Sequence, residues 1–321
     1  MENKISEKIA VIIPMYNVES HIAEVIQTIP DSVAFIIAID DCSIDNTWMI
    51  VNKIYDKRLI LLQHKKNTGV GGAMQTGFQA AIDKEATIIV KIDGDGQMPI
   101  LFLDDLLVPI LNGKADFTKG NRFANMEEII SMPTIRRIGN LGLSFVTKVA
   151  SGYWNIFDPT NGFFAMDVTT LKRLRLETLH KRYFFESSLL CTLYRVGAVV
   201  MDIPMPAVYA NERSSLSAGK SLLEFPPLLF TNFLKRIWLR YFVLDFSVAS
   251  ISLIFGMLFL LFGGIWGIYY WWKSMVTNIP ATAGTVIIAA LPVILGFQLI
   301  LQFLSIDIQN VPYLPKNRRI H

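Results

Sequence analysis

Short apolar runs alternate with amphipathic segments over the N-terminal two thirds of the chain. The runs IAVIIPMY, AFIIAID, LILLQH and TIIVKID have the length and β-branched content of buried parallel strands. Between them, HIAEVIQTI, NTWMIVNKIY and GGAMQTGFQAAID show the apolar spacing of helices. This order predicts an α/β fold whose functional site lies at the carboxyl ends of the strands.

Two long stretches nearer the C-terminus, residues 246–272 and 281–306, contain no charged residue. Each is longer than the about 20 apolar residues that cross a bilayer. Lys273, Asn278 and Pro280 interrupt the pattern between them, and the aromatic cluster at residues 269–272 fits a membrane interface. The pattern predicts two antiparallel transmembrane helices joined by a short connection.

Basic residues flank both predicted spans on the side away from this connection, in which only Lys273 is charged. The positive-inside bias therefore predicts a multi-pass protein of the cell membrane, with its catalytic portion and both termini in the cytoplasm. The flanking residues are Lys235, Arg236 and Arg240 before the first span, and Lys316, Arg318 and Arg319 after the second.

The segment before the first span, SLLEFPPLLFTNFLKRIWLRYF, mixes apolar patches with basic residues. Pro226 and Pro227 argue against one continuous helix. We expect one or two interfacial helices that lie on the membrane, with a helix pair packed beneath the catalytic domain as the alternative. The predicted divisions are a catalytic domain over residues 1–216, juxtamembrane helices over 217–242, the transmembrane hairpin over 243–306 and a cytoplasmic tail over 307–321.

Composition narrows the class of protein. A hydrophobic content of 52% and a mean hydropathy of +0.40 indicate that part of the apolar surface faces lipid. The 30 basic and 27 acidic residues give a net charge of +3, too balanced for a protein whose main partner is nucleic acid. Cys42 and Cys191 form no disulfide framework and fit a reducing compartment.

Acidic residues follow two of the predicted strands. Asp93, Asp95 and Gln97 come at alternate positions after TIIVKI, where their oxygens can face one side of a turn. Such hard donors suit a Mg²⁺ or Mn²⁺ ion that also holds diphosphate oxygens. Asp40 and Asp41 follow AFIIAI, and adjacent carboxylates there suit a base edge or a ribose hydroxyl. An acidic turn without a ligand and a simple helix cap are the plainer explanations of these two motifs.

A glycine-rich turn, NTGVGGA at residues 67–73, follows the strand LILLQH. Its spacing matches neither the Rossmann fingerprint nor a P-loop. It predicts a strand-to-helix turn that allows close packing of the backbone, with the nucleotide as one candidate neighbour.

In order and spacing, PMYN at 14–17, DDCSIDNT at 40–47, NTGVGGA at 67–73 and DGDGQ at 93–97 resemble the motifs of family 2 glycosyltransferases. DGDGQMP, the GNR of residues 120–122, RRIGN at 136–140, DPTNGF at 158–163 and the two spans are similar to polyprenyl-phosphate glycosyltransferases, such as dolichyl-phosphate mannose and glucose synthases. The resemblance implies a Rossmann-like GT-A fold, a nucleotide-sugar donor, a divalent metal and a lipid monophosphate acceptor at the cytoplasmic membrane surface.

Carried over by position, the resemblance assigns roles to residues at the strand ends. Asp95 and Gln97 would bind the Mg²⁺ or Mn²⁺ ion, and Asp93 would approach the ribose or the sugar. The residues that would frame the nucleoside are Pro14, Tyr16, Asp40 and Asp41.

Three positions depart from the family pattern. Val18 stands where Glu is frequent, and Glu19 follows one residue later. Cys42 stands where Gly is usual, and Phe164 stands where many relatives carry Arg. Contacts with the donor sugar or its phosphates are therefore expected to differ at these positions.

Basic residues suit a donor and an acceptor that both carry phosphate. Arg122 follows the apparent strand ADFTKGN and can hold a phosphate through two hydrogen bonds. Arg136 and Asn140 are four residues apart, so on a helix they share one face and can address one anionic group. A solvated surface charge is the plainer explanation for each. The other candidates for acceptor or phosphate binding are Arg137, and Arg213 and Lys220 on either side of SSLSAG, which can close over the site.

Glu186, with Asp95 and Arg122, is a candidate catalytic residue. It lies where other family 2 enzymes place a carboxylate base for a sugar hydroxyl. A phosphate monoester needs no such base, because its oxygen is already anionic near neutral pH. We therefore expect Glu186 to orient the acceptor or to pair with a nearby Arg.

Together these features predict an inverting transfer of sugar from a nucleotide sugar to undecaprenyl or dolichyl phosphate, for cell-envelope glycan or glycoprotein synthesis. The acceptor phosphate would attack the anomeric carbon while the metal and Arg122 stabilise the departing nucleoside diphosphate. One alternative is a membrane polysaccharide synthase, although the Gln-x-x-Arg-Trp motif that such enzymes share is not found. The other is a non-catalytic membrane scaffold that binds nucleotide sugar. The sequence leaves open the sugar, the nucleoside and the oligomeric state, a homo-oligomer included.

Overall fold

The structure is a computed structural model that describes residues 7–123, 134–206 and 218–316. The described residues form two units. The first runs to Phe233 and includes the residues from Pro312 onward, and the second comprises Leu234–Val311. The first unit holds the α/β fold predicted for the catalytic domain, and the second holds both predicted spans.

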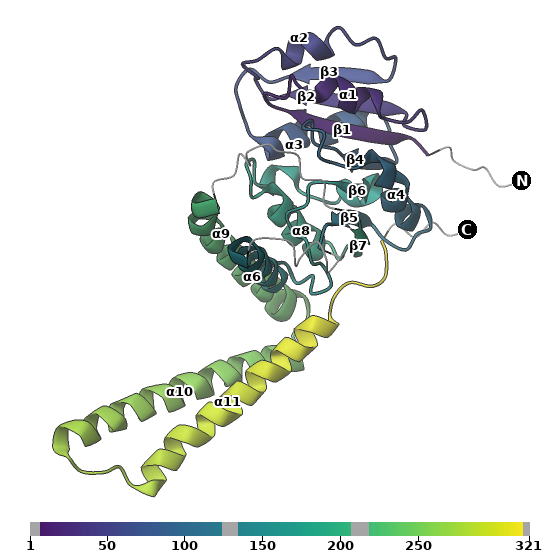
Figure 1. Cartoon of the computed structure of the whole chain (residues 1–321). Coiled ribbons are helices and arrows are strands. Elements are labelled where there is room, and N and C mark those ends of the chain that lie inside the picture. The colour runs from purple at the N-terminus through teal and green to yellow at the C-terminus, as the bar shows by residue number, and fades with distance from the viewer. Residues whose placement is uncertain (1–6, 124–133, 207–217, 317–321) are drawn as a thin grey trace, which may run out of the picture. The chain divides into compact units, whose positions relative to one another are not determined.

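A mixed sheet lies at the centre of the first unit (Figure 1) and, within the described residues, has seven strands in the order β3-β2-β1-β4-β6-β5-β7. All run in one direction except β6, which is antiparallel to both of its neighbours. The four predicted parallel strands are confirmed as β1 to β4, which lie side by side. The strands are β1 (Ile9–Met15), β2 (Phe35–Asp40), β3 (Leu59–Gln63), β4 (Ile88–Lys91), β5 (Phe117–Asn121), β6 (Phe164–Asp167) and β7 (Val200–Pro204).

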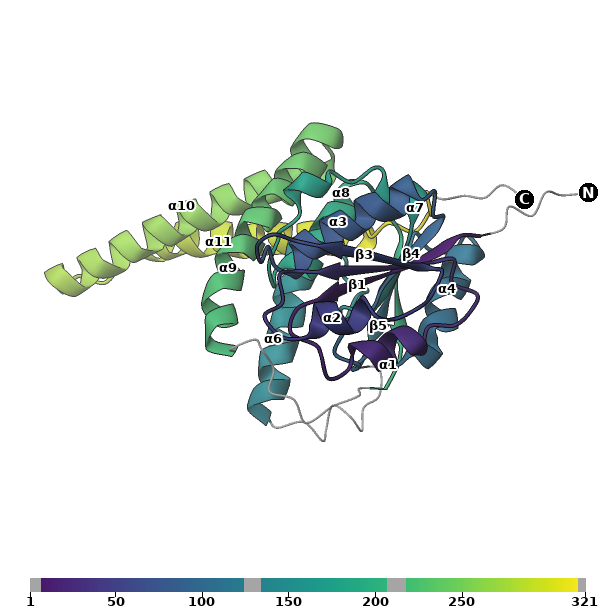
Figure 2. The same ribbon diagram turned by 90° about the horizontal axis from the view of Figure 1, so that it is seen from above.

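Helices cover both faces of the sheet (Figure 2). On one face, Val11 and Ile13 of β1 share a buried cluster with Ile26 of α1 (Ile22–Gln27) and Leu106 of α4 (Leu103–Leu111). On the other face, α3 (Val70–Asp83) packs against β1 and β2. Successive residues of a strand point to opposite faces, which is why a strand covered on both sides reads as a continuous apolar run. The remaining helices of this unit are α2 (Thr47–Val51), η1 (Ile100–Phe102), α6 (Thr134–Ser151), α7 (Val168–Leu171), η2 (Leu176–Thr178) and α8 (Phe185–Arg195).

The juxtamembrane segment forms one helix, α9 (Ala218–Trp238), which continues through Pro226 and Pro227. The expectation that these prolines prevent a continuous helix is therefore wrong. Each proline removes one backbone hydrogen bond, but the flanking Phe225 and Leu229 are buried in an apolar cluster with Ala150 and Phe184. Packing of this face holds the helix across the two prolines.

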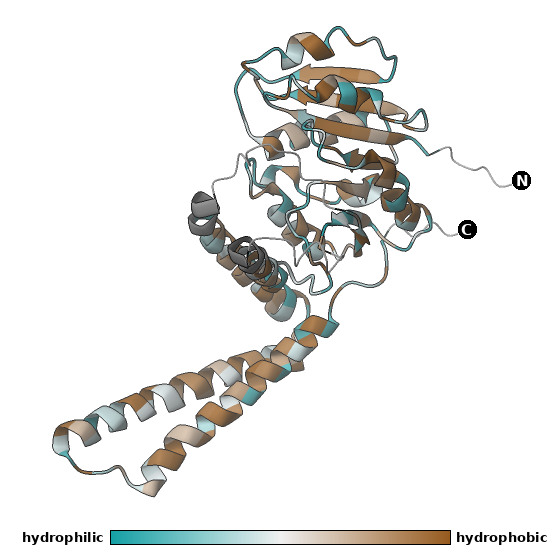
Figure 3. Ribbon diagram, in the orientation of Figure 1, coloured by the Kyte–Doolittle hydropathy of each residue, from teal (hydrophilic) through white to brown (hydrophobic). Residues whose placement is uncertain are grey.

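The second unit is dominated by two long antiparallel helices, α10 (Val248–Thr277) and α11 (Ala283–Gln309), which agree closely with the predicted spans. Each has a stretch with a mean hydropathy of 2.3, and they are the two helices of the described residues that are long and apolar enough to cross a membrane. Apolar residues run along most of both helices (Figure 3), and few are buried by the rest of the chain. The chain is therefore a membrane protein by the character of this unit.

One end of this hairpin contains a buried ion pair. Arg236, near the end of α9, contacts Asp307 of α11 with both terminal nitrogens, at 2.6 Å and 3.0 Å. The hydroxyl of Tyr241, which lies in a π-helical turn η3 (Leu239–Leu244), donates to the same carboxylate at 2.6 Å. The exposed fractions of Arg236 and Asp307 are 2% and 1%. Arg236, counted above as a basic flank of the membrane, is thus an internal partner of Asp307.

Candidate active site

The carboxyl ends of the parallel strands bring the predicted donor-site residues to one edge of the sheet. Pro14 lies on β1 and Tyr16 follows it, with 48% of its surface exposed. Asp40 ends β2 and Asp41 follows it, Asp93 comes two residues after β4, and Arg122 comes directly after β5. The prediction that these residues gather at the strand ends agrees with the sheet order.

Asp41 is fully occupied by contacts within the protein. It accepts hydrogen bonds from the backbone N–H groups of Thr68 (2.9 Å) and Gly69 (2.7 Å) and from the Thr68 hydroxyl (2.8 Å), and His64 Nδ1 lies 2.7 Å away. Only 3% of its surface is exposed. These bonds fix the glycine-rich turn to the end of β2. Asp41 is therefore a buried residue that holds the backbone of this part of the site in place.

Asp40 is also buried, and it accepts hydrogen bonds from the Ser43 N–H group (3.3 Å) and from Gln63 Nε2 (3.1 Å). Directly after this pair of aspartates, Cys42 has a φ of 64°. This left-handed conformation favours glycine, which gives a physical reason for the Gly that relatives carry at this position.

The loops after β1 and β2 are joined by reciprocal hydrogen bonds. Glu19 Oε2 accepts from both the backbone and the side-chain nitrogens of Asn46, each at 2.9 Å, while the Glu19 N–H group donates to Asp45 at 3.1 Å. Asn17 Oδ1 accepts from the Ile44 N–H group at 2.9 Å. The displaced Glu19 thus holds the two loops together.

The glycine-rich turn packs closely against another backbone segment, as its sequence predicted. The Gly72 N–H group donates to the Lys181 carbonyl at 3.1 Å. A Cβ atom on Gly71 would lie 2.1 Å from the His180 carbonyl oxygen, so any larger residue would force the two segments apart. The neighbour is the segment that leads into α8, and this contact sets where the first turn of α8 lies.

The acidic loop after β4 is tied to α8 by a buried lysine. Lys91 Nζ lies 2.7 Å from Asp93 Oδ1 and 3.2 Å from Glu186 Oε1, in the first turn of α8. Burial lowers the pKa of Lys91, but Asp93 and Glu186 outweigh that effect and raise it above its ordinary value. We expected Glu186 to orient the acceptor or to pair with an arginine, and the partner that the structure gives it is a lysine. Within the acidic loop, the Gln97 N–H group donates to Asp95 Oδ1 at 3.0 Å.

Arg122 is held by Asp158, from the DPTNGF segment. Arg122 Nε lies 2.8 Å from Asp158 Oδ2, and a terminal nitrogen lies 3.1 Å from Oδ1. Burial raises the pKa of Asp158, but Arg122 and Lys119 outweigh it, so the carboxyl titrates below its usual range. Lys119 is buried and donates to the Asp158 carbonyl oxygen. With 37% of its side chain exposed, Arg122 presents an oriented guanidinium at the edge of the sheet.

Sequence reasoning did not assign Lys91, Lys119 or Asp158. The available signal was a lysine at the end of the apolar run TIIVK and another within the apparent strand ADFTKGN, since an unpaired charge is rarely buried. Phe164, at the position where the family pattern often has Arg, lies in the core, and its ring centroid is 4.9 Å from that of Phe117. It therefore offers no charge to a phosphate.

Asp202 of β7 is another carboxylate that the sequence did not single out. The Phe157 N–H group donates to its Oδ2 at 2.7 Å, whereas its buried Oδ1 has no partner among the described residues. Burial raises the pKa of Asp202 to about 6, although Lys119 acts to lower it. Ionisation of this carboxyl therefore opposes folding.

We expect Asp202→Asn to stabilise the folded protein above pH 6. The carboxyl has a pKa of about 6 when folded against an ordinary value of 3.8, so the parent loses stability as the pH rises through that interval. The variant lacks this loss and gains up to about 3 kcal/mol near neutral pH. Thermal unfolding of both proteins across this range measures the difference, and a difference that does not vary with pH would contradict the assignment.

The predicted acceptor residues are placed only in part. Arg136, Arg137 and Asn140 lie on α6, so the predicted helix is present, while the positions of their side chains lie outside what the structure describes. Lys220 lies on α9, again without a described side chain, and Arg213 lies outside the described residues. Their roles stay predictions.

The donor set of the acidic loop fits a divalent cation that is completed by its substrate. Within residues 7–123, 134–206 and 218–316, no three His, Cys, Asp or Glu side chains are grouped as metal ligands. Asp95 and Gln97, both half-buried, offer one carboxylate and one amide oxygen. Mg²⁺ is commonly bound by one or two carboxylates together with substrate phosphates. This sparse set therefore suits an ion that arrives with a diphosphate.

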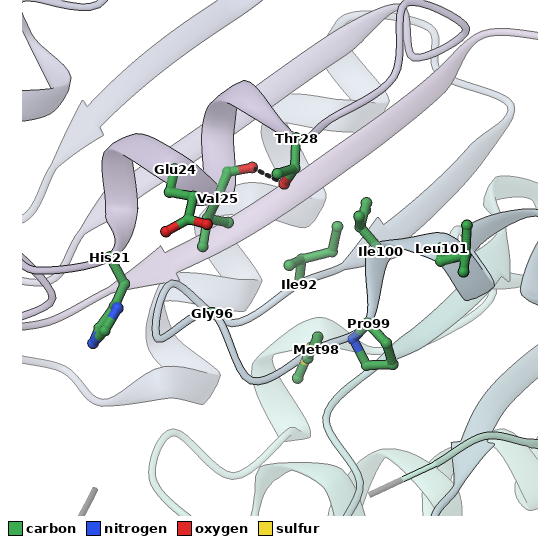
Figure 4. A pocket seen from close by; sticks show the side chains of 10 residues that line it. All are labelled: His21, Glu24, Val25, Thr28, Ile92, Gly96, Met98, Pro99, Ile100 and Leu101. Carbon is green, nitrogen blue, oxygen red and sulfur yellow. Dashed lines mark hydrogen bonds between the residues drawn. The ribbon is translucent and has the colours of Figure 1, made fainter. Parts of the chain in front are cut away.

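A hollow of about 390 Å³ lies beside the acidic loop, which lines it with Gly96 (Figure 4). On one side it is bounded by α1 and the residue before it, and on the other by the chain from Ile92 to Leu101. Of the predicted site residues whose side chains the structure describes, none lines it. Its lining is His21, Glu24, Val25, Thr28, Ile92, Gly96, Met98, Pro99, Ile100 and Leu101.

Comparisons with known proteins agree with this geometry. Residues 10–175 match the profile of glycosyl transferase family 2. A UDP-N-acetylglucosamine–dolichyl-phosphate N-acetylglucosaminyltransferase of Methanococcus voltae is 32% identical over 230 residues, which cover 67% of this chain and 90% of that protein. An undecaprenyl-phosphate mannosyltransferase of Micrococcus luteus is 25% identical over 217 residues, or 66% of this chain and 88% of that protein.

Among solved structures, a glucosyl-3-phosphoglycerate synthase of Mycobacterium tuberculosis, in complex with Mn²⁺, UDP and phosphoglyceric acid, shares the fold. The two superpose with a TM-score of 0.54 at 20% identity, over 72% of this chain and 78% of that one. The likeness confirms the GT-A architecture predicted from the sequence.

Proposed function

The chain belongs to glycosyl transferase family 2, and from that premise we propose that it transfers a sugar from a nucleotide sugar to the phosphate of a polyprenyl phosphate. One observation carries the choice of acceptor: a single chain combines a family 2 donor fold with two helices apolar enough to cross a membrane. Relatives named for undecaprenyl and dolichyl phosphate support it. As predicted, the enzyme is a glycosyltransferase.

In this proposal the nucleotide lies across the ends of β1, β2 and β4. Tyr16 would offer its exposed side chain to the base, whereas Asp40 and Asp41 are buried. Asp95 and Gln97 would hold a Mg²⁺ or Mn²⁺ ion, which would neutralise charge on the diphosphate. Arg122, oriented by Asp158, stabilises the charge that develops on the leaving diphosphate.

The acceptor phosphate needs no deprotonation to attack the anomeric carbon, since its oxygen is already anionic. One C–O bond forms as the bond to the diphosphate breaks, and attack opposite the leaving group inverts the anomeric configuration. The protein then acts mainly by positioning and charge stabilisation.

Exposed apolar side chains on the first unit support a membrane-facing surface. Phe145 and Leu141 of α6 are 60% and 44% exposed, and Phe230 of α9 is 61% exposed. These residues would rest on the lipid surface from which the acceptor headgroup projects. We propose the division of the chain accordingly, with a catalytic domain, interfacial helices and a hairpin anchor.

The path of the chain after α11 supports a topology with both ends of the hairpin on the catalytic side. The Lys316 N–H group donates to both carboxylate oxygens of Asp116, at 2.8 Å and 3.0 Å, so the chain returns to the first unit after the second span. Since the spans are antiparallel, the connection between them would lie on the far side. Together with the basic flanks, this supports our proposal that the catalytic unit lies in the cytoplasm.

The test is to incubate membranes that carry the protein with a panel of radiolabelled nucleotide sugars and polyprenyl phosphate. We expect label from one donor to enter the lipid fraction in a reaction that requires Mg²⁺ or Mn²⁺. Label that enters only a growing polymer would identify a polysaccharide synthase. Nucleotide binding without turnover of any donor would identify a non-catalytic scaffold.

For the acceptor, we expect Arg136→Ala to weaken use of polyprenyl phosphate about ten- to hundredfold while donor binding stays near the parent value. A lost charge-assisted hydrogen bond to phosphate accounts for this size. The measurement pairs donor affinity by calorimetry with acceptor dependence in the lipid-transfer assay. If Arg136→Ala lowered donor affinity and left the acceptor dependence normal, Arg136 would belong to the diphosphate site.

A further inference from the structure

Lys91 joins two acidic groups that belong to different parts of the predicted site. Its ammonium lies 2.7 Å from Asp93 in the acidic loop and 3.2 Å from Glu186 on α8. These residues are up to 95 positions apart along the chain. The exposed side-chain fractions are 1% for Lys91, 33% for Asp93 and 14% for Glu186, so the cation lies beneath two carboxylates that reach the surface.

The space around this cluster is closed by Gly162 of the DPTNGF segment. A Cβ atom at this position would lie 2.3 Å from Lys91 Nζ and 2.8 Å from Asp93 Oδ2. A larger residue at this position would therefore displace the ends of the lysine and aspartate side chains from the place where they meet. The cluster is therefore formed by β4, the acidic loop, α8 and the segment before β6, and each of them limits its geometry.

We propose that Lys91 is a positioning residue, which fixes Asp93 toward the donor sugar and Glu186 toward the acceptor by holding both carboxylates on one buried ammonium. The inference rests on the proposed function and adds a role that the sequence motifs do not assign. It also gives Glu186 the role of a charged, oriented partner of the lysine and not that of a proton acceptor.

The charge balance supports this assignment. Lys91, Asp93 and Glu186 together carry a formal charge of −1, and removal of the lysine leaves two carboxylates facing one buried space with no cation between them. Like charges in a partly desolvated site repel strongly. The two side chains would then separate, and the sugar and the acceptor would lose the alignment on which transfer depends.

The experiment is a double-mutant cycle with Lys91→Met and Glu186→Gln, both close in volume to the parent residues. Turnover is followed as release of nucleoside diphosphate, and lipid labelling is recorded separately. We expect Lys91→Met to lower kcat about ten- to hundredfold and Glu186→Gln to lower it by less. In the double variant, Glu186→Gln should add almost nothing, because the carboxylate has already lost its anchor.

A second readout separates positioning from loss of folding. If Lys91 acts by positioning Asp93 and Glu186, binding of UDP or GDP with Mn²⁺, which would depend on the predicted metal ligands Asp95 and Gln97, should stay within about threefold of the parent in Lys91→Met. Gly162→Ala, which keeps every charge but crowds the cluster, should lower kcat as Lys91→Met does. Lys53→Met, at an exposed lysine, is the matched control and should leave both quantities unchanged.

A normal kcat in Lys91→Met would overturn the inference. So would an equal reduction of kcat by Glu186→Gln in the parent and in Lys91→Met. A reduction of kcat by a thousandfold or more in Glu186→Gln alone would also overturn it, because it would indicate that Glu186 is a base. If Lys91→Met does not fold, Glu186→Gln and Gly162→Ala still decide the matter. If the parent releases nucleoside diphosphate but does not label polyprenyl phosphate, the proposed acceptor is refuted. The double-mutant cycle can still be measured in that case, because it is followed by release of nucleoside diphosphate.

Discussion

Asp95→Asn is expected to abolish sugar transfer and to leave the fold and membrane insertion intact. The substitution keeps the shape of the side chain and the oxygen that accepts the Gln97 N–H group, but it removes the negative charge. The acidic loop offers few metal donors of its own, so loss of one carboxylate removes a large share of the attraction for Mg²⁺ or Mn²⁺. We expect turnover to fall at least about hundredfold.

The measurement compares transfer by parent and variant across titrations of Mg²⁺ and Mn²⁺. Asp105→Asn, the same chemical change at an exposed carboxylate of α4, is the control and should behave as the parent does. A variant as active as the parent, in a reaction indifferent to both ions, would show that Asp95 is not a metal ligand.

The fold could be predicted from the sequence where local pattern and final environment agree. β1 to β4 are apolar because helices cover both faces of the sheet. The continuous apolar sequence of each strand therefore predicted its burial. β6 and β7 have four and five residues, and β6 pairs with β4, more than 70 residues earlier in the chain. Such short strands with distant partners leave little local signal.

The structure agrees with the predicted positions of the candidate residues at the strand ends. Contacts between residues that meet only through the tertiary fold were not predicted. The acidic loop could be predicted because Asp93 and Asp95 follow a strand with a clear apolar pattern. The pairing of Lys91 with Glu186, or of Arg122 with Asp158, depends on segments that the fold brings together from 95 and 36 residues apart. The spacing of residues along the chain predicts neither contact.

Asp40 and Asp41 illustrate a different limit. Two adjacent carboxylates at a strand end suggest a ligand, but their backbone and side-chain partners already use these oxygens. A buried carboxylate has to be satisfied by hydrogen bonds, and a turn that supplies N–H groups does so as well as a nucleoside would. The sequence alone shows the carboxylate that accepts hydrogen bonds, but it does not show which N–H or O–H group donates them.

Asp307→Ala should strongly destabilise the second unit. The substitution leaves Arg236 and the Tyr241 hydroxyl buried without the carboxylate that both contact. Removal of one partner from a buried ion pair costs about 3–5 kcal/mol, because the remaining charge is left in a site of low dielectric. Asp245→Ala, at an exposed aspartate of the same unit, should cost little.

Unfolding of the purified protein in detergent, followed by tryptophan fluorescence, measures both variants against the parent. A second substitution provides the sharper test. Arg236→Met should restore the part of the stability that Asp307→Leu loses through the charge left on Arg236, since an apolar pair of similar volume can replace a buried ion pair. If Asp307→Ala unfolds as the parent does, the pair contributes nothing to the hairpin. If the double variant is no more stable than Asp307→Leu, the loss comes from packing around Asp307 and not from the charge left on Arg236.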